Sequence, residues 1–233
     1  MFSYYGSKSK IVDYYPPPKY GKIIEPFAGS ARYSLKYWDR DVLLVDKYDV
    51  IIRIWNYLKS CSPKDIISLY IPKLRETINK NQYDCEESFL FMSFVIKSGT
   101  HAPAYTVCKN RGGDGQIYDI LKRISKNVWK IKEWKIQKDS YDNIDNMECT
   151  WFIDPPYQYG GKHYIESNKN INFKTLSDWC KSRQGQVIVC ENIKADWMPF
   201  KPIIDMRGTK FKTTEVIWSN YETNYDFIQQ RLF

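Results

Sequence analysis

The sequence predicts an α/β fold, with one domain built on a largely parallel sheet and interrupted by a mostly helical insertion. The first observation behind this prediction is a set of short apolar runs without alternating polar residues. Such runs are typical of strands buried in a parallel sheet that helices cover on both faces. The second observation is length, because 233 residues suffice for one well-buried domain and a modest insertion. The four apolar runs are residues 22–25, 42–46, 151–154 and 186–190.

Helix-compatible segments follow the first two predicted strands. They cover residues 32–38 and 50–59, and the second has its apolar residues at helical spacing. An alternation of strand and helix places ligands at the carboxyl ends of the strands. Two further strands are predicted at 134–138 and 214–221.

The middle of the chain interrupts this alternation. Ser62 and Pro63 are typical of a helix start, and a second helix is predicted over residues 87–97. A hairpin is predicted from 105 to 118, around a glycine-rich tip. We therefore assign residues 1–59 and 134–233 to one α/β domain and residues 60–133 to an insertion.

The charge and composition indicate a partner class only weakly. A net charge of +8 and a pI near 9.0 favour a polyanionic partner. Lysine outnumbers arginine, however, and an A+T-rich genome imposes the same profile whatever the function.

Metal, disulfide and membrane functions find no support in the sequence. The six cysteines are dispersed and only two histidines are present, so we expect no metal site and no disulfide framework. Residues 1–10 lack the apolar core of a signal peptide, and the longest apolar run, 89–96, is too short to span a bilayer. We expect a cytoplasmic protein without a membrane partner. Its oligomeric state is open.

The tetrapeptide Asp154-Pro155-Pro156-Tyr157, directly after a predicted buried strand, carries the most chemical information. A carboxylate and a backbone carbonyl can both accept hydrogen bonds from an amine, and two prolines make the segment rigid. Such preorganised acceptors favour attack by a weakly nucleophilic amine. Tyr157 offers a face on which an extruded base can stack. A plain strand-to-turn transition explains the same tetrapeptide equally well.

A second motif lies at residues 25–32, where a strand runs into a loop of small residues and then a helix. Gly29 lets the backbone approach a ligand closely. Asp46 ends the next strand, where a carboxylate can accept both hydroxyls of a ribose. Taken alone, a tight turn and a helix cap are the alternatives. Together the two features indicate a nucleoside-bearing cofactor.

Four segments of the chain, in order, resemble the Dam-type family of adenine-specific DNA methyltransferases. Residues 4–8, Tyr-Tyr-Gly-Ser-Lys, resemble the family's aromatic-x-Gly-Gly-Lys motif, and residues 25–30 match Glu-Pro-Phe-x-Gly-Ser. Asp46 matches the ribose-binding acid, and residues 154–157 match the catalytic tetrapeptide. The resemblance implies a Rossmann-like S-adenosylmethionine-dependent methyltransferase domain. It assigns to the cofactor Tyr4, Lys8, Glu25, Pro26, Phe27, Gly29, Ser30, Asp46, Asp139 and Asp154.

The chain departs from the family at two positions. Ser7 stands where the family usually has glycine, and Ala31 stands where a second glycine is frequent. Both residues are small. Asp rather than Asn at position 154 favours a DNA substrate over protein glutamine.

The same resemblance makes the insertion the target-recognition region, with double-stranded DNA as the partner. An amphipathic helix is predicted over residues 117–132, and its basic residues suit backbone phosphates, although a solvated lysine face explains them as well. In the glycine-rich tip, Arg111 is the best candidate for reading bases, and a mobile surface turn explains the tip equally well. The candidate DNA-binding residues are Lys109, Arg111, Lys122, Arg123, Lys126 and Lys130.

The sequence therefore predicts transfer of a methyl group from S-adenosylmethionine to the N6 amine of a flipped adenine. Asp154, Pro155, Pro156 and Tyr157 form the predicted catalytic group. Methylation of an RNA adenine or of cytosine N4, and a catalytically silent DNA-binding module of the same fold, are the alternatives.

Overall fold

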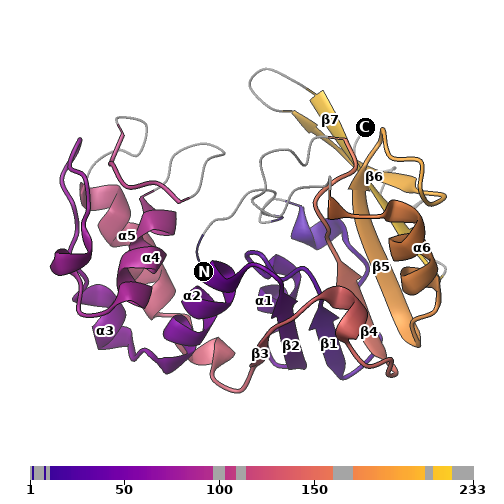
Figure 1. Cartoon of the computed structure of the whole chain (residues 1–233), viewed down its shortest axis with the longest axis horizontal. Coiled ribbons are helices and arrows are strands. Elements are labelled where there is room, and N and C mark those ends of the chain that lie inside the picture. Colours follow the sequence, from indigo (N-terminus) through magenta and orange to yellow (C-terminus); the bar gives the residue numbers. More distant parts are fainter. Residues whose placement is uncertain are drawn as a thin grey trace. The chain divides into compact units, whose positions relative to one another are not determined.

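The computed structural model describes residues 2, 8, 11–96, 103–108, 114–159, 170–207 and 212–221 (Figure 1). The chain divides into two compact units. One comprises Met1–Ser7 and Tyr48–Ile136, and the other comprises Lys8–Lys47 and Gln137–Phe233.

Among the described residues, seven strands form one sheet, in the order β3-β2-β1-β4-β5-β7-β6 (Figure 1). The strands are β1 (Lys22–Glu25), β2 (Asp41–Asp46), β3 (Lys135–Lys138), β4 (Cys149–Ile153), β5 (Gly185–Asn192), β6 (Lys201–Arg207) and β7 (Lys212–Ser219).

The sheet has the connectivity of a doubly wound α/β fold. Strands β2, β1, β4 and β5 are parallel neighbours. Strand β7 is antiparallel to both β5 and β6, so β6 runs in the same direction as β5. The chain order reverses between β1 and β4, which makes this position the topological switch point where such sheets bind ligands. The predicted Rossmann-like α/β fold class is confirmed.

Both faces of the central strands are covered by apolar side chains from other elements. Successive residues of a strand face opposite sides, so Trp151 and Phe152 of β4 pack on different layers. On one face, Leu176 and Cys180 of α6 (Phe173–Lys181) join the core that contains Trp151. On the other, Tyr33 of α1 (Arg32–Lys36) stacks on Phe152, with ring centroids 4.2 Å apart. This double covering explains why the strands are continuously apolar.

The other compact unit is mostly helical, and its helices pack through aromatic side chains. It contains α2 (Asp49–Ser60), α3 (Pro63–Ile67), α4 (Glu86–Val95) and α5 (Asp114–Ser125), with the 3-10 turns η2 (Lys80–Gln82) and η4 (Val128–Ile131). Phe2 lies 5.2 Å from the ring of Trp55 in α2 and 5.9 Å from that of Phe94 in α4. None of the described helices is long and apolar enough to cross a membrane.

Helix starts follow the sequence signals. Ser62 accepts a hydrogen bond from the Asp65 amide, and the Asp65 carboxylate accepts one from the Ser62 amide, so α3 begins with the expected cap. Helix α2 belongs to the helical unit, whereas the sequence analysis placed residues 50–59 in the α/β domain. The boundaries of the catalytic domain stay a prediction.

Two predictions for residues 105–132 are wrong. Residues 116–118 belong to α5 and not to a hairpin, and the helix predicted over 117–132 ends at Ser125. The Asn127 side chain donates a hydrogen bond to the Arg123 carbonyl at 2.8 Å, competing with helix continuation. Apolar side chains stay buried beyond this break. Val128 and Ile131 are three residues apart in the 3-10 turn η4, and this spacing places both on the same face of the turn.

Strand β6 and helix α6 have no counterpart in the sequence analysis. A proline such as Pro202 makes a strand hard to predict from sequence. Strand β6 lies at the edge of the sheet, where proline is tolerated. The pairing of β6 with β7 also shifts register between Pro202 and Ile204.

Candidate active site

Three acidic residues lie at the carboxyl ends of adjacent central strands. Glu25 is the last residue of β1, Asp46 is the last residue of β2, and Asp154 follows the last residue of β4. Because β2, β1 and β4 are parallel neighbours, these residues share one edge of the sheet, at the switch point.

The loop after β1 folds back onto the end of β2. The Gly29 amide donates a hydrogen bond to Oδ2 of Asp46 at 3.0 Å, and the Ala28 amide donates to the Val45 carbonyl at 2.9 Å. Gly29 has φ +42°, a conformation that favours glycine. Ala31 has φ +43°, a conformation in which an L side chain costs about 1 kcal/mol.

Glu25 precedes this loop and binds another part of the chain. It is buried, and its Oε1 accepts a hydrogen bond from the Ser34 amide in the first turns of α1 at 2.7 Å. Burial raises the pKa of Glu25 to about 8, and the charge of Asp154 acts in the same direction. Pro26 and Ser30 are buried beside it, and Phe27 stacks on Tyr141 with ring centroids 5.3 Å apart.

Asp154 forms an ion pair with Lys8. Oδ1 of Asp154 lies 3.0 Å from Nζ of Lys8, and the two side chains keep 19% and 7% of their accessible surface. Burial raises the pKa of Asp154 to about 6, and the charge of Lys8 opposes this shift. Pro155 and Pro156 are buried directly after it.

Tyr157, the last residue of the tetrapeptide, is held by Lys8 and Glu215. Lys8 donates a hydrogen bond to the Tyr157 hydroxyl, which in turn donates to Oε1 of Glu215 at 2.6 Å. The same Oε1 accepts a hydrogen bond from Tyr15 at 2.7 Å and lies 3.4 Å from Nζ of Lys8. Burial, reinforced by the charge of Glu215, raises the pKa of Tyr157 well above its ordinary value.

Glu191 near the end of β5 fixes the chain after the tetrapeptide. Its carboxylate is buried and accepts hydrogen bonds from the amides of Gln158, at 2.6 Å, and Asn192, at 2.8 Å. The indole of Trp197 donates to it at 3.2 Å. Burial raises the pKa of Glu191 to about 7.

Around Asp154, carboxyl groups outnumber cations among the described residues. The carboxylates of Glu25, Glu191 and Glu215 all interact electrostatically with Asp154. In the described part of the chain, Lys8 is the one cation within ion-pair distance of Asp154 and Glu215. A cationic group that entered this edge of the sheet would therefore be stabilised.

Asp139 follows β3, and its amide donates to the Asp46 carbonyl at 3.3 Å. Its carboxylate accepts hydrogen bonds from the side chains of Asn143 and Gln137 and from the Ser140 amide. These bonds, with that of Asn143 the strongest, lower its pKa. The backbone thus brings Asp139 next to the end of β2, and its contact to a cofactor stays a prediction.

The remaining predicted residues lie elsewhere or are not described. Tyr4, Lys109 and Arg111 fall outside the described residues. Lys122 and Arg123 of α5 and Lys126 after it are exposed, and Lys130 in η4 is half-buried. All four belong to the helical unit.

Sequence reasoning missed Tyr15, Glu191 and Glu215. The one available signal was an acid inside a segment predicted to be a buried strand, because such a residue requires partners. Glu215 is 1% exposed, between Thr214 and Val216. Its partners come from residues about 60 and 200 positions away in the chain, and only the fold reveals them.

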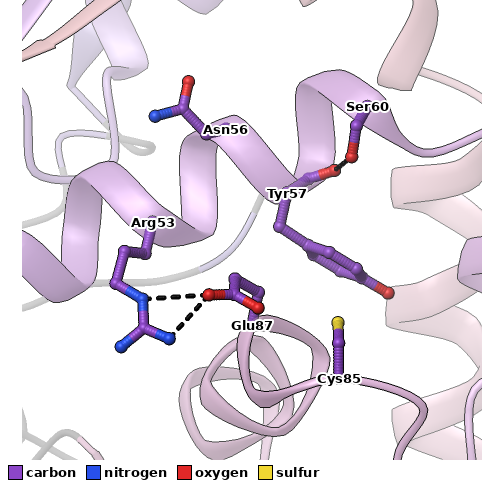
Figure 2. A pocket seen from close by; sticks show the side chains of 6 residues that line it. All are labelled: Arg53, Asn56, Tyr57, Ser60, Cys85 and Glu87. Carbon is purple, nitrogen blue, oxygen red and sulfur yellow. Dashed lines mark hydrogen bonds and ion pairs between the residues drawn. The ribbon is translucent and has the colours of Figure 1, made fainter.

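The helical unit has a pocket of its own, with a volume of about 400 Å³. Figure 2 shows Arg53 of α2 and Glu87 of α4 pointing toward one another across it, with Nε and a terminal nitrogen of Arg53 donating to Glu87 at 3.1 and 2.6 Å. Its other lining residues are Asn56, Tyr57, Ser60 and Cys85. Because the charges of Arg53 and Glu87 neutralise each other, this pocket is a weaker candidate for an active site than the acidic edge of the sheet.

The fold and the acidic site define a Rossmann-like α/β protein with a candidate site at its switch point. No family model and no curated protein matches the chain. Among solved structures it is similar to the yhhF protein of Escherichia coli, provisionally assigned as a methyltransferase, with 9% identity and a TM-score of 0.34 over 90% of this chain and 78% of that one. It is also similar to a Haemophilus influenzae protein provisionally assigned as a methylase, with 10% identity and a TM-score of 0.37 over 86% and 80%. The fold class rests on the strand order of the sheet itself.

Proposed function

We propose that this chain is an S-adenosylmethionine-dependent methyltransferase that methylates the N6 amine of adenine in DNA. One observation carries the proposal. Asp154 to Tyr157 lies at the carboxyl end of β4, across the switch point from the loop in which the Gly29 amide binds Asp46. A cofactor motif and an amine-binding motif, separated by more than a hundred residues in the sequence, thus share one edge of the sheet.

The residues present fit the methyl donor. Asp46 ends β2 beside the Gly29 loop, and a carboxylate is a suitable acceptor for the hydroxyls of a ribose. When bound, S-adenosylmethionine supplies a methyl group on a positively charged sulfur. The excess of carboxylates around Asp154 stabilises a cation there.

Asp154 is suited to hold an amine. With its pKa raised to about 6, its carboxylate is mostly ionised at neutral pH and accepts hydrogen bonds from the amine. The raised pKa also makes it a better proton acceptor than an exposed aspartate, as the amine acquires positive charge. Tyr157 is fixed through its hydroxyl, and the Lys8 ammonium lies 4.4 Å from the centroid of its ring, so we propose the face of the ring away from Lys8 as the stacking surface for an extruded base.

The basic residues of the helical unit complete the proposal. Lys122, Arg123 and Lys126 are exposed and neutralise backbone phosphates of duplex DNA. Lys130 contributes in the same way, and Lys109 and Arg111 are proposed to contact the DNA from the preceding segment.

Radiolabelled methyl transfer from S-adenosylmethionine tests the function. The purified chain is incubated with duplex DNA and with RNA, and the products are digested to nucleosides. Label in N6-methyladenine from DNA is expected. Label in RNA or in N4-methylcytosine would transfer the proposal to those substrates. Cofactor binding without transfer to any nucleic acid would overturn it in favour of a silent binding module.

The Asp154→Ala variant tests whether methyl transfer depends on the candidate site. Transfer is expected to be lost while S-adenosylmethionine binding, measured by calorimetry, is partly retained. Glu148→Gln is the matched control, because Glu148 is exposed and precedes β4 at the opposite edge of the sheet. Near-normal turnover by Asp154→Ala would contradict the assignment.

A further inference from the structure

We propose that Glu215 is a positioning residue that holds Lys8 and Tyr157 around Asp154 and takes over the Lys8 ammonium when Asp154 binds the amine. This inference rests on the proposed methyltransferase function. It concerns a residue of the closing strand β7 that belongs to none of the motifs.

One oxygen of Glu215 gathers three groups. Oε1 accepts hydrogen bonds from Tyr157 at 2.6 Å and from Tyr15 at 2.7 Å, and lies 3.4 Å from Nζ of Lys8. Because Lys8 also donates to the Tyr157 hydroxyl, Lys8, Tyr157 and Glu215 form a closed triangle beside Asp154.

Glu215 lies on a strand that is paired on both sides. Strand β7 pairs with β5 on one side and with β6 on the other, and Glu215 lies opposite Asn192 and Ile204 in these pairings. With its side chain 2% exposed, Glu215 cannot exchange its protein partners for water. A carboxylate held this way fixes the groups that bind it.

Two positive charges meet at Asp154 in the proposed reaction. Oδ1 of Asp154 is 3.0 Å from the Lys8 ammonium, and the amine that binds the same carboxylate acquires positive charge as it is methylated. Glu215 already forms an ion pair with that ammonium at 3.4 Å, and a displacement of a few tenths of an ångström shortens it to the length of a strong hydrogen bond. Lys8 can then leave Asp154 without becoming an unpaired buried charge.

The charge of Glu215 also acts on the protonation of Asp154. The negative charge of Glu215 raises the Asp154 pKa and that of Lys8 lowers it. Among the described residues, the other titratable groups that act on or respond to the Asp154 charge, besides these two and Tyr157, include Tyr15, Glu25, Cys190 and Glu191. Removing the charge at residue 215 removes one repulsion on the Asp154 carboxylate and takes from the Lys8 ammonium its ion pair with Glu215, so that this ammonium acts more strongly on Asp154. Both effects favour the ionised form of Asp154.

The test is the pH dependence of methyl transfer by Glu215→Gln, with Glu148→Gln as control. Glu215→Gln is expected to lower kcat roughly tenfold at the pH plateau. Its acidic limb is expected to move roughly one pH unit lower than in the wild type. A merely structural role lowers activity without moving the limb, and an unshifted limb with wild-type kcat would overturn the proposal.

Two further measurements keep the test decisive. Glu215→Asp retains the charge but has a shorter side chain, so it is expected to keep the acidic limb of the pH profile and to lower kcat. A wild-type kcat in Glu215→Asp would count against the proposal, even if Glu215→Gln fails to fold. Carbon-13 NMR titration of Asp154, assigned by comparison with Asp154→Asn, needs no turnover. If the wild type shows no transferase activity, the proposed function fails, while an Asp154 titration unaffected by Glu215→Gln overturns the inference separately.

Discussion

Two clusters in this protein pair lysine or arginine with carboxylates, and the difference in burial shifts the pKa values of their carboxyl groups in opposite directions. At the carboxyl edge of the sheet, Lys8 lies between Asp154 and Glu215, and the pKa of Asp154 is raised to about 6. In the helical unit, Arg53 and Lys80 both bind Glu86, and the pKa of Glu86 is lowered to about 2.

The difference lies in solvent access and in the ratio of charges. The side chains of the helical cluster keep between 31% and 63% of their accessible surface, and its two cations face two carboxylates, so its charges compensate one another. The site cluster is largely withdrawn from water and has more carboxylates than cations in the described part of the chain. Carboxyl groups whose pKa values are raised by burial and by like charges are typical of functional sites, and this is why the acidic edge of the sheet is the candidate site.

The largest expected effect separates the two clusters by activity. Asp154→Asn keeps the size of the side chain but removes its charge, so methyl transfer is expected to fall roughly 10²–10³-fold or more. Glu86→Gln makes the same chemical change in the exposed cluster and is expected to leave the rate within a factor of about two. Initial rates on duplex DNA measure both. Equal losses in the two variants would abolish the contrast.

Stability as a function of pH is the next largest effect. Glu25 has a folded pKa of about 8, against a usual value of 4.5, so its contribution to stability is complete below pH 4.5 and is lost as the pH rises through 8. The wild-type free energy of unfolding is therefore expected to decrease by a few kcal/mol between pH 5 and 8. Urea unfolding of Glu25→Gln is expected to show a smaller decrease.

Glu86 provides the control for this pH dependence. Its folded pKa of about 2 lies below its usual value, so its contribution is present above pH 4.5 and is lost as the pH falls toward 2. Glu86→Gln should therefore leave the slope between pH 5 and 8 unchanged. A flat wild-type profile in that range would contradict the buried, raised-pKa carboxylates.

A smaller effect is expected from exposed charges that have a proposed partner. The double variant Lys122→Gln, Lys126→Gln is expected to weaken duplex DNA binding roughly three- to tenfold at low salt. The slope of the logarithm of affinity against the logarithm of salt concentration should decrease by about 0.9 for each phosphate that the protein no longer neutralises. Lys174→Gln, Lys181→Gln on α6 removes the same charge from exposed helix positions and serves as control. Equal weakening by both pairs would assign the effect to net charge.

The smallest effect is expected in the exposed cluster itself. Arg53 binds Glu86 and Glu87 with two-thirds of its side chain covered, yet surface pairs of this kind contribute at most about 1 kcal/mol. Arg53→Gln is expected to change the free energy of unfolding by no more than that and to leave methyl transfer unchanged. Thermal unfolding and the transfer assay decide this. A loss of activity would make the pocket in Figure 2 functional.

Local signals in the sequence predicted the central strands and most helix starts. Strand β1 has the predicted bounds, and the ends of β2, β4 and β5 differ from the predicted ones by at most two residues. These elements are predictable because continuous burial on both faces leaves an uninterrupted apolar run. The cap of α3 was equally legible, since Ser62, Pro63 and Asp65 are neighbours in the chain.

Elements whose form depends on distant contacts were not predictable. Strand β6 contains a proline and exists because β7 offers it an edge. The break between α5 and η4 depends on the side chain of Asn127, while the apolar spacing on both sides of it suits one continuous helix.

The sequence by itself determined the α/β class and the position of the candidate site, because Glu25, Asp46 and Asp154 each directly end or follow an apolar run, and parallel strands bring their carboxyl ends to one edge. Only the tertiary structure decided what surrounds Asp154. Lys8, Tyr15 and Glu215 come from the beginning and the end of the chain, and their pairing with the tetrapeptide depends on β7 closing against β5. The physical reason is that a pKa and an ion pair depend on distance and burial, which no spacing along the chain specifies.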